Sequence, residues 1–289
     1  MTKDELWLLT EKYGGALSPA YEADRARLAS GEPLAYVIGW QPFLGLKIYL
    51  DSHPLIPRPE TEWWVDALLR EPSRGVPEKR VPQRVGARGG DFSAEKDAAL
   101  LEGTLDEAPL KFLDLCAGSG AIGCAALKLT DADIYFGEID PAHQATIEKN
   151  VRENDLDASR AHIKIGDLFE PFGDMRFDII ACNPPYIPTE RVLEKSVADY
   201  EPALALRSGN DGLDLIRRIA TELRQHLTPA GVAWIECDSA HAAAPTPRGG
   251  GAPITSVGAA CALFTSAGFS ATIRTDQYKV PRVIVVSFS

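Results

Sequence analysis

The second part of the chain alternates short apolar runs with amphipathic stretches, and this alternation restricts the fold more than any other feature. From Leu110 onward, runs such as "KFLDLCAGSG" and "ADIYFGEID" are separated by segments with helical periodicity, such as "HQATIEKNVREN". Strands that alternate with helices form a parallel sheet covered by helices on both faces. We therefore predict an α/β domain over residues 110–289.

Seven strands are expected in this domain. The last two, "SATIRTDQY" and "RVIVVSFS", are joined too tightly for a crossover helix. They are therefore predicted to pair as an antiparallel hairpin at the edge of an otherwise parallel sheet.

The remaining segments are predicted to form a small N-terminal region and two insertions. Residues 1–70 are predicted to contain one or two short helices before residue 30, a hairpin over residues 35–50, and a helix that starts near Thr61 as its cap. Residues 71–109 are rich in proline and glycine, with a basic first half and an acidic second half, and predict a mobile insertion or linker. A second low-complexity insertion is predicted over residues 242–256.

Charge and cysteine content restrict the partners and the compartment. The chain has 41 acidic and 30 basic residues, which disfavours a partner bound mainly through phosphates. Its five cysteines form no CxxC pair and no metal-ligand spacing, so we predict reduced thiols and no metal site. No apolar run is long enough to span a membrane, and the acidic first residues fit neither a transit peptide nor a secretory signal. A cytoplasmic location is expected, with a mitochondrial one left open.

A glycine-rich turn follows the first predicted strand, in "LDLCAGSGAIG". Gly118 and Gly120 let the backbone approach a ligand closely, and Asp114 stands at the strand end, where its carboxylate can face a cation or an amine. The spacing is neither a dinucleotide G-x-G-x-x-G placed for a pyrophosphate nor a P-loop. The turn therefore favours a ligand with an ammonium and a sulfonium group over one with phosphates.

Two more acidic residues end the second and third predicted strands. Glu138 is expected to accept hydrogen bonds from two ribose hydroxyls, with Asp140 on the same face as the alternative. Asp167 can accept from an adenine amino group, with Leu168 packed on the ring. Three acids at the ends of three successive strands, beside a glycine turn, predict an S-adenosylmethionine site.

The fourth strand ends in "CNPPYIP", which predicts a site for the methyl acceptor. An amide nitrogen is a poor nucleophile because its lone pair is delocalised. The side-chain oxygen of Asn183 can accept one N–H of the acceptor, and the carbonyl of Pro184 can accept the other. The prolines hold both acceptors in place, and Tyr186 offers a flat face to a planar group.

These motifs resemble a known family. "FLDLCAGSGAIG", "CNPPYIP", "YEPALAL" and "PLIPRPETE" are similar to the protein-(glutamine-N5) methyltransferases that modify class 1 peptide chain release factors, the HemK/PrmC family. The resemblance runs from about Gly31 to the C-terminus. It implies a class I methyltransferase fold, S-adenosylmethionine as donor, and the glutamine of a release-factor Gly-Gly-Gln loop as acceptor.

The resemblance also implies roles for individual residues. The residues from Cys116 to Gly120, Ala117 and Ser119 included, would line the methionine part of the cofactor. Glu138 would hold the ribose, and Asp167 with Leu168 would frame the adenine. The acceptor glutamine would be held by Asn183, Pro184, Pro185 and Tyr186, under a segment that comprises Arg58, Pro59, Glu60 and Thr61, with Glu201 and Pro202 at the rim.

The chain departs from the family pattern in places. Cys116 and Ala117 stand where the family commonly has Gly-Thr, and Glu138 stands where an aspartate is usual. Only about 30 residues precede Gly31, whereas the family often has a longer helical domain there. We hypothesise that the basic insertion at residues 74–88 helps to bind the release factor, which deletion of residues 74–90 would test.

Two other functions are compatible with the sequence. An adenine-N6 methyltransferase acting on DNA or RNA shares the NPPY chemistry on a flipped base, but it needs a nucleic-acid platform that an acidic chain does not offer. A binding protein that keeps the fold without catalysis is disfavoured, because the motif residues are all intact.

Overall fold

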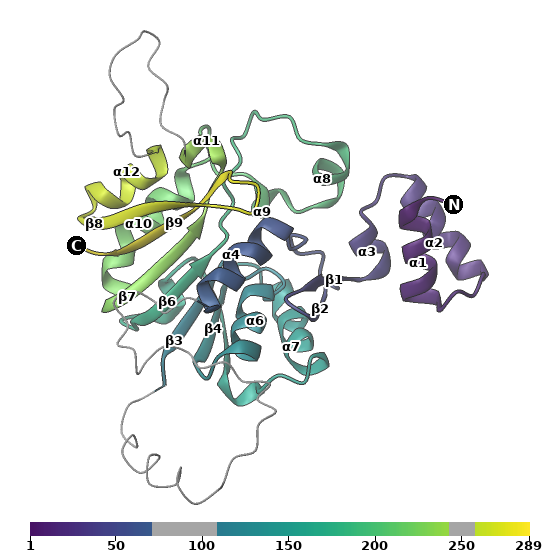
Figure 1. Cartoon of the computed structure of the whole chain (residues 1–289), viewed down its shortest axis with the longest axis horizontal. Helices are drawn as coiled ribbons and strands as arrows, with labels where there is room; N and C mark the ends of the chain where they lie inside the picture. The colour runs from purple at the N-terminus through teal and green to yellow at the C-terminus, as the bar shows by residue number, and fades with distance from the viewer. Residues whose placement is uncertain (71–108, 243–257) are drawn as a thin grey trace, which may run out of the picture.

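A seven-stranded sheet forms the centre of the computed structural model, which describes residues 1–70, 109–242 and 258–289 (Figure 1). The strand order is β5-β4-β3-β6-β7-β9-β8. In chain order the strands are β3 (Lys111–Leu115), β4 (Asp133–Glu138), β5 (Ala161–Ile165), β6 (Phe177–Cys182), β7 (Leu227–Glu236), β8 (Phe269–Thr275) and β9 (Pro281–Phe288).

Strand directions confirm the mostly parallel sheet. β3, β4, β5, β6 and β7 pair in parallel, and β9 pairs antiparallel with both β7 and β8. The last two strands therefore form the predicted hairpin, with β8 as the edge strand and β9 inside the sheet. All five parallel strands end at the same side, which places their carboxyl-terminal turns together.

Each face of the sheet has its own core, because successive side chains of a strand point to opposite faces. In β6, Ile179 and Ala181 join one core, whereas Ile180 and Cys182 join the other. The first core is covered by α4 (Pro59–Arg70), α6 (Ala121–Leu129) and α7 (Gln144–Glu153). The second is covered by α10 (Asp214–His226) and α12 (Ala259–Ser266).

Short elements connect the layers. They are the 3-10 helices η2 (Pro141–His143), η3 (Ala158–Arg160) and η4 (Glu170–Phe172), and the helices α8 (Lys195–Tyr200), α9 (Ala203–Leu206) and α11 (Ser239–Ala242). None of the helices in the described ranges is long and apolar enough to cross a membrane.

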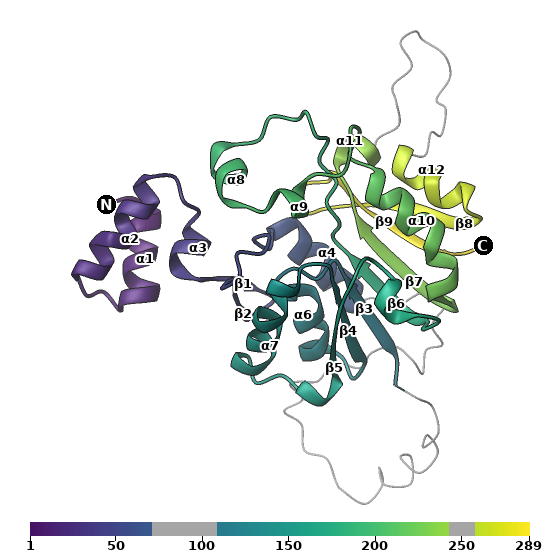
Figure 2. The same ribbon diagram turned by 180° about the vertical axis from the view of Figure 1, so that it is seen from behind.

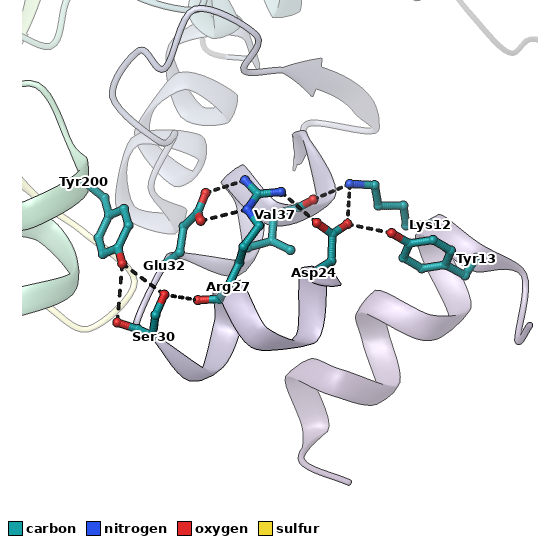
Figure 3. Close-up of polar contacts among 8 residues, drawn as sticks. All are labelled: Lys12, Tyr13, Asp24, Arg27, Ser30, Glu32, Val37 and Tyr200. Carbon is teal, nitrogen blue, oxygen red and sulfur yellow. Dashed lines mark hydrogen bonds and ion pairs between the residues drawn. The ribbon is translucent and has the colours of Figure 1, made fainter. Parts of the chain in front are cut away.

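The N-terminal helices form a separate small unit beside the sheet domain (Figure 1). α1 (Lys3–Tyr13), α2 (Pro19–Ala29) and α3 (Leu34–Ile38) share a core of Leu8, Leu9, Tyr21, Val37 and Ile38. Figure 3 shows how Asp24 ties this unit together: its carboxylate accepts from Lys12, Tyr13 and Arg27 at 2.7, 2.7 and 2.8 Å.

This helical unit touches the sheet domain at α8. The hydroxyls of Ser30 and Tyr200 lie 3.3 Å apart (Figure 3). Tyr200 is the last residue of α8, whose ribbon lies beside the N-terminal helices in Figure 2. The first 30 residues therefore contact the segment that follows the fourth sheet strand.

The predicted hairpin is correct only in part. Its strands are β1 (Trp40–Phe43) and β2 (Leu46–Tyr49), but residues 35–38 belong to α3. Val37 and Ile38 are buried in the N-terminal core, so tertiary packing overrides their β propensity.

The predicted cap of α4 is wrong. The helix begins at Pro59, a favoured first helical residue, so Thr61 lies within the first turn. The hydroxyl of Thr61 donates to Glu236 instead of capping the helix.

The two predicted insertions, apart from their end residues 109 and 242, lie outside the described residues. The basic run at residues 74–88 lies there as well.

We expect Gly123→Ala to lower the free energy of unfolding by about 1–3 kcal/mol, the usual cost of overpacking a core. A Cβ atom at Gly123 would lie 2.2 Å from Cε1 of Phe136, which is fully buried. Denaturant unfolding measures the loss. The double variant Gly123→Ala/Phe136→Leu should recover part of it, and strictly additive losses would contradict a direct clash.

Candidate active site

The turns after the first four sheet strands surround a cavity of about 330 Å³. Predicted residues from all four turns line it, and so does the predicted residue Pro202 of the "YEPALAL" segment, beside Leu204 and Ala205. They are Cys116 and Gly118 after β3, Glu138 at the end of β4, Asp167 and Leu168 after β5, Asn183 and Pro185 after β6, and Pro202. The structure thus brings together strand ends that are far apart in the sequence.

A second cavity of about 320 Å³ adjoins the first. Arg58, Pro184 and Tyr186 line it, together with Val192, Leu193, Glu194 and Val197. Asn183 lines both cavities, as do Leu55 and Ala205. Two different ligands can therefore meet at Asn183.

The glycine turn after β3 is tightly wound. Cys116, Gly118 and Gly120 all have positive φ, at 63°, 55° and 75°. The left-handed region favours glycine, so Cys116 holds a strained backbone. Cys116, which stands where the family commonly has glycine, therefore has a conformational cost, although its side chain is small.

Asp114 does not line either cavity. Its side chain is completely buried, and one carboxylate oxygen accepts the Gly123 N–H at 2.8 Å. Burial raises the pKa of this carboxyl well above its usual range, and the nearby charge of Glu138 adds to the effect. Direct contact of Asp114 with a bound ligand would therefore require the turn to move.

Glu138 links the turns after β3 and β4. Its carboxylate accepts the Gly118 N–H at 2.7 Å and the Asp140 N–H at 2.9 Å, and its side chain is nearly buried. Asp140 also lines the cavity, but one of its oxygens caps η2 through the Ala142 N–H at 2.9 Å. Both candidates for the ribose contact are therefore in place, and only Glu138 holds the glycine turn.

Asp167 is paired with a residue that the sequence analysis missed. Arg218 of α10 donates to both carboxylate oxygens of Asp167, at 3.1 and 3.0 Å, and both residues line the first cavity. A carboxylate has about four lone-pair sites, so Asp167 can still accept a further hydrogen bond. Leu168 beside it has a φ of 48°, a second strained position in the cavity wall.

The two acceptors predicted after β6 have no protein donor in the described residues. Neither the side-chain oxygen of Asn183 nor the carbonyl of Pro184 receives a hydrogen bond there, and Asn183 donates through Nδ2 to Thr61. The Tyr186 hydroxyl donates to Glu236 at 2.9 Å. Burial and the Glu236 charge raise the pKa of Tyr186 well above its usual range, so the phenol stays protonated.

Glu236, at the end of β7, is a buried acid that the sequence analysis overlooked. Besides Tyr186, it accepts from Thr61 Oγ1 and Trp64 Nε1, both at 2.7 Å. It stands in "GVAWIECD", an acid at the end of the fifth predicted strand. The reasoning applied to the first three strand ends would have found it.

The partly exposed Arg58, which lines the second cavity, forms an ion pair with the buried Glu201. Arg58 Nη2 donates to Glu201 Oε1, and Glu201 Oε2 accepts the Ile56 N–H at 3.2 Å. The side chain of Glu201 is nearly buried. The pair joins the "IPRPETE" segment to the "YEPALAL" segment.

Other predicted residues lie beside the cavities without lining them. These are Pro59, Glu60, Thr61, Ala117, Ser119, Gly120 and Glu201. The sequence analysis missed several lining residues, including Leu55, Ile139, His143, Val192 and Arg218. Ile139 stands directly between the two predicted acids Glu138 and Asp140, and this position in the sequence could have identified it as a cavity residue.

The fold and the site together define an S-adenosylmethionine-dependent methyltransferase of class I. The mostly parallel seven-stranded sheet has an antiparallel strand next to its edge, and acidic turns surround the cavity at its carboxyl end. The family model for the methyltransferase small domain matches residues 85–200.

Curated relatives narrow the assignment. The release factor glutamine methyltransferase of Geobacter sulfurreducens is 35% identical over 73% of this chain and 62% of its own length. That of Lactococcus lactis is 31% identical over 82% of this chain and 70% of its own length. The ribosomal protein uL3 glutamine methyltransferase of Bradyrhizobium diazoefficiens is 32% identical over 71% of this chain and 57% of its own length.

This chain belongs to the release factor glutamine methyltransferase family, the PrmC/HemK family. It spans about three fifths of the length of the Geobacter and Bradyrhizobium proteins.

Proposed function

We propose that this protein transfers a methyl group from S-adenosylmethionine to the side-chain amide nitrogen, N5, of the glutamine in the Gly-Gly-Gln loop of a peptide chain release factor. One observation carries the proposal. Asn183 lies where the two cavities meet, and its side-chain oxygen and the neighbouring Pro184 carbonyl have no protein donor among the described residues.

The first cavity fits the methyl donor. S-adenosylmethionine supplies an electrophilic methyl group on its sulfonium. Glu138 accepts from the ribose hydroxyls, and Asp167 and Leu168 hold the adenine. Cys116 and Gly118, which line the cavity, would contact the methionine part. Acidic side chains suit this ligand because it carries positive charge and hydroxyl donors, whereas phosphates would be repelled.

The second cavity fits a primary amide. The two amide hydrogens point to Asn183 Oδ1 and to the Pro184 carbonyl, and this places the nitrogen lone pair toward the donor methyl. Methyl transfer would form the N–C bond as the S–C bond breaks, and the excess proton on the nitrogen would then pass to water. Both acceptors are fixed before reaction, so little reorganisation is required.

The known acceptors of the relatives favour a protein glutamine over an adenine. The Geobacter and Lactococcus relatives are named for glutamine methylation of release factors, and the Bradyrhizobium relative is named for glutamine methylation of ribosomal protein uL3. Glutamine in ribosomal protein uL3 is therefore the second candidate acceptor. These relatives give no support to the adenine-N6 alternative. It also requires binding to nucleic acid, which the acidic composition of the chain disfavours.

A labelled-methyl transfer assay tests the proposal. Purified protein and labelled S-adenosylmethionine are incubated in parallel with a release factor, the same factor with the Gly-Gly-Gln glutamine changed to alanine, uL3, and mixed DNA and RNA. We expect label on the unchanged release factor alone. Label on uL3 alone would support glutamine methylation, but with uL3 as the acceptor protein in place of a release factor. Label on nucleic acid alone would reject the proposal.

A further inference from the structure

Thr61 joins Asn183 to the buried acid Glu236. Thr61 Oγ1 lies 3.3 Å from Asn183 Nδ2 on one side and 2.7 Å from Glu236 Oε2 on the other. Thr61 and Glu236 are only 3% and 1% exposed, so water does not replace these partners. The three side chains come from α4, the turn after β6, and the end of β7.

The direction of each hydrogen bond follows from the chemistry of Trp64. Its indole N–H can only donate, and it donates to Glu236 Oε2 at 2.7 Å. Oε2 is therefore an acceptor whether or not the other carboxyl oxygen carries a proton. A hydroxyl beside this acceptor gives its single proton to it, so the Thr61 proton points to Glu236.

A threonine hydroxyl that has donated its proton can only accept from its other neighbour. The Asn183 amide must then turn its NH₂ group toward Thr61, which places Oδ1 on the opposite side of the amide. The hydrogen-bond network thus fixes the orientation of this amide.

We propose that Thr61 is a positioning residue, which uses the acceptor Glu236 to make Asn183 present its oxygen, and not its NH₂ group, to the methyl acceptor. The inference rests on the proposed function, since it names how that site selects its substrate class. An outward oxygen selects acceptors that offer N–H. A flipped Asn183 would place an NH₂ group against the NH₂ group of the acceptor, and two donors cannot pair.

Removal of the Thr61 hydroxyl should release the Asn183 amide. We expect Thr61→Val to lower kcat about tenfold, the loss of one oriented hydrogen bond in the transition state, with KM and the Kd of S-adenosylmethionine within about twofold of wild type. Thr61→Ser restores the hydroxyl and should return kcat to within about threefold of wild type.

Thr130→Val is the matched control. Thr130 is also fully buried, and its hydroxyl donates to Ala126 at 2.8 Å outside both cavities. This variant should lose stability with kcat unchanged. The proposal is overturned by a kcat of Thr61→Val that equals that of wild type, or by a kcat of Thr61→Ser as low as that of Thr61→Val.

A second measurement is independent of turnover. The side-chain NH₂ resonances of Asn183, assigned by their loss in Asn183→Asp, should shift in Thr61→Val and return in Thr61→Ser. Unchanged resonances in Thr61→Val would overturn the proposal. This result stands even if no glutamine acceptor is methylated, so a failure of the proposed function and a failure of the Thr61 inference are distinguishable.

Discussion

Asn183→Ala should lower kcat on the glutamine acceptor by about a hundredfold, which corresponds to about 2.7 kcal/mol of transition-state stabilisation. The Asn183 side-chain oxygen is one of two acceptors without a protein donor among the described residues at the junction of the cavities. Its removal leaves one N–H of the acceptor unpaired and the nitrogen poorly aligned, and it makes no change to Glu138 or Asp167.

Single-turnover kinetics measures this loss without product release, and calorimetry measures cofactor affinity separately. The Kd of S-adenosylmethionine should remain within about threefold of wild type, because the lost interaction is aimed at the acceptor. Asn154→Ala is the control. The Asn154 amide bonds the Lys47 backbone outside both cavities, so its loss should affect stability alone. Near-normal turnover of Asn183→Ala would reject the role assigned to the NPPY turn.

Glu138→Ala should weaken S-adenosylmethionine binding by about thirty- to a hundredfold, since hydrogen bonds to a charged group contribute about 1.5–3 kcal/mol each. The substitution removes the proposed ribose acceptor. It also leaves the Gly118 and Asp140 N–H groups without their carboxylate, so the glycine turn loses its link to β4. Asp140→Ala should weaken binding less, by about fivefold or less, because Asp140 mainly caps η2.

A cofactor analogue separates the two effects of Glu138. S-adenosylhomocysteine and its 2′-deoxy form are titrated into wild type, Glu138→Ala and Asp140→Ala. If Glu138 holds the ribose, the deoxy form should bind wild type more weakly and lose less affinity on substitution. An equal loss for both ligands would assign Glu138 to the turn alone, and a selective loss in Asp140→Ala would transfer the ribose contact to Asp140.

The strands, and their alternation with helices along the chain, were predictable from the local sequence pattern. Short apolar runs separated by amphipathic segments have few alternatives to a parallel sheet, and the tight link before the last strand excludes a crossover. The chemistry at the strand ends was also readable, because turns after parallel strands converge on one side of the sheet. Glu138, Asp167 and Asn183 were found in this way, and all three line the same cavity.

Local pattern failed where packing decided the conformation. Residues 35–38 have the β-branched and aromatic character of a strand, but they form a helix because Val37 and Ile38 complete the N-terminal core. Thr61 resembles a helix cap, but α4 begins at Pro59 and the hydroxyl donates to Glu236 at the end of β7.

From the sequence alone came the fold class, the methyl donor and the residues that end the first four strands, because these depend on period, length and the chemistry of single side chains. Only the tertiary structure decided the partners: Thr61 with Glu236, Asn183 with Thr61, Arg58 with Glu201, and Asp167 with Arg218. The residues of these pairs are 175, 122, 143 and 51 positions apart. No periodicity spans such separations, since the pairs form only where helix packing and strand order bring the segments together.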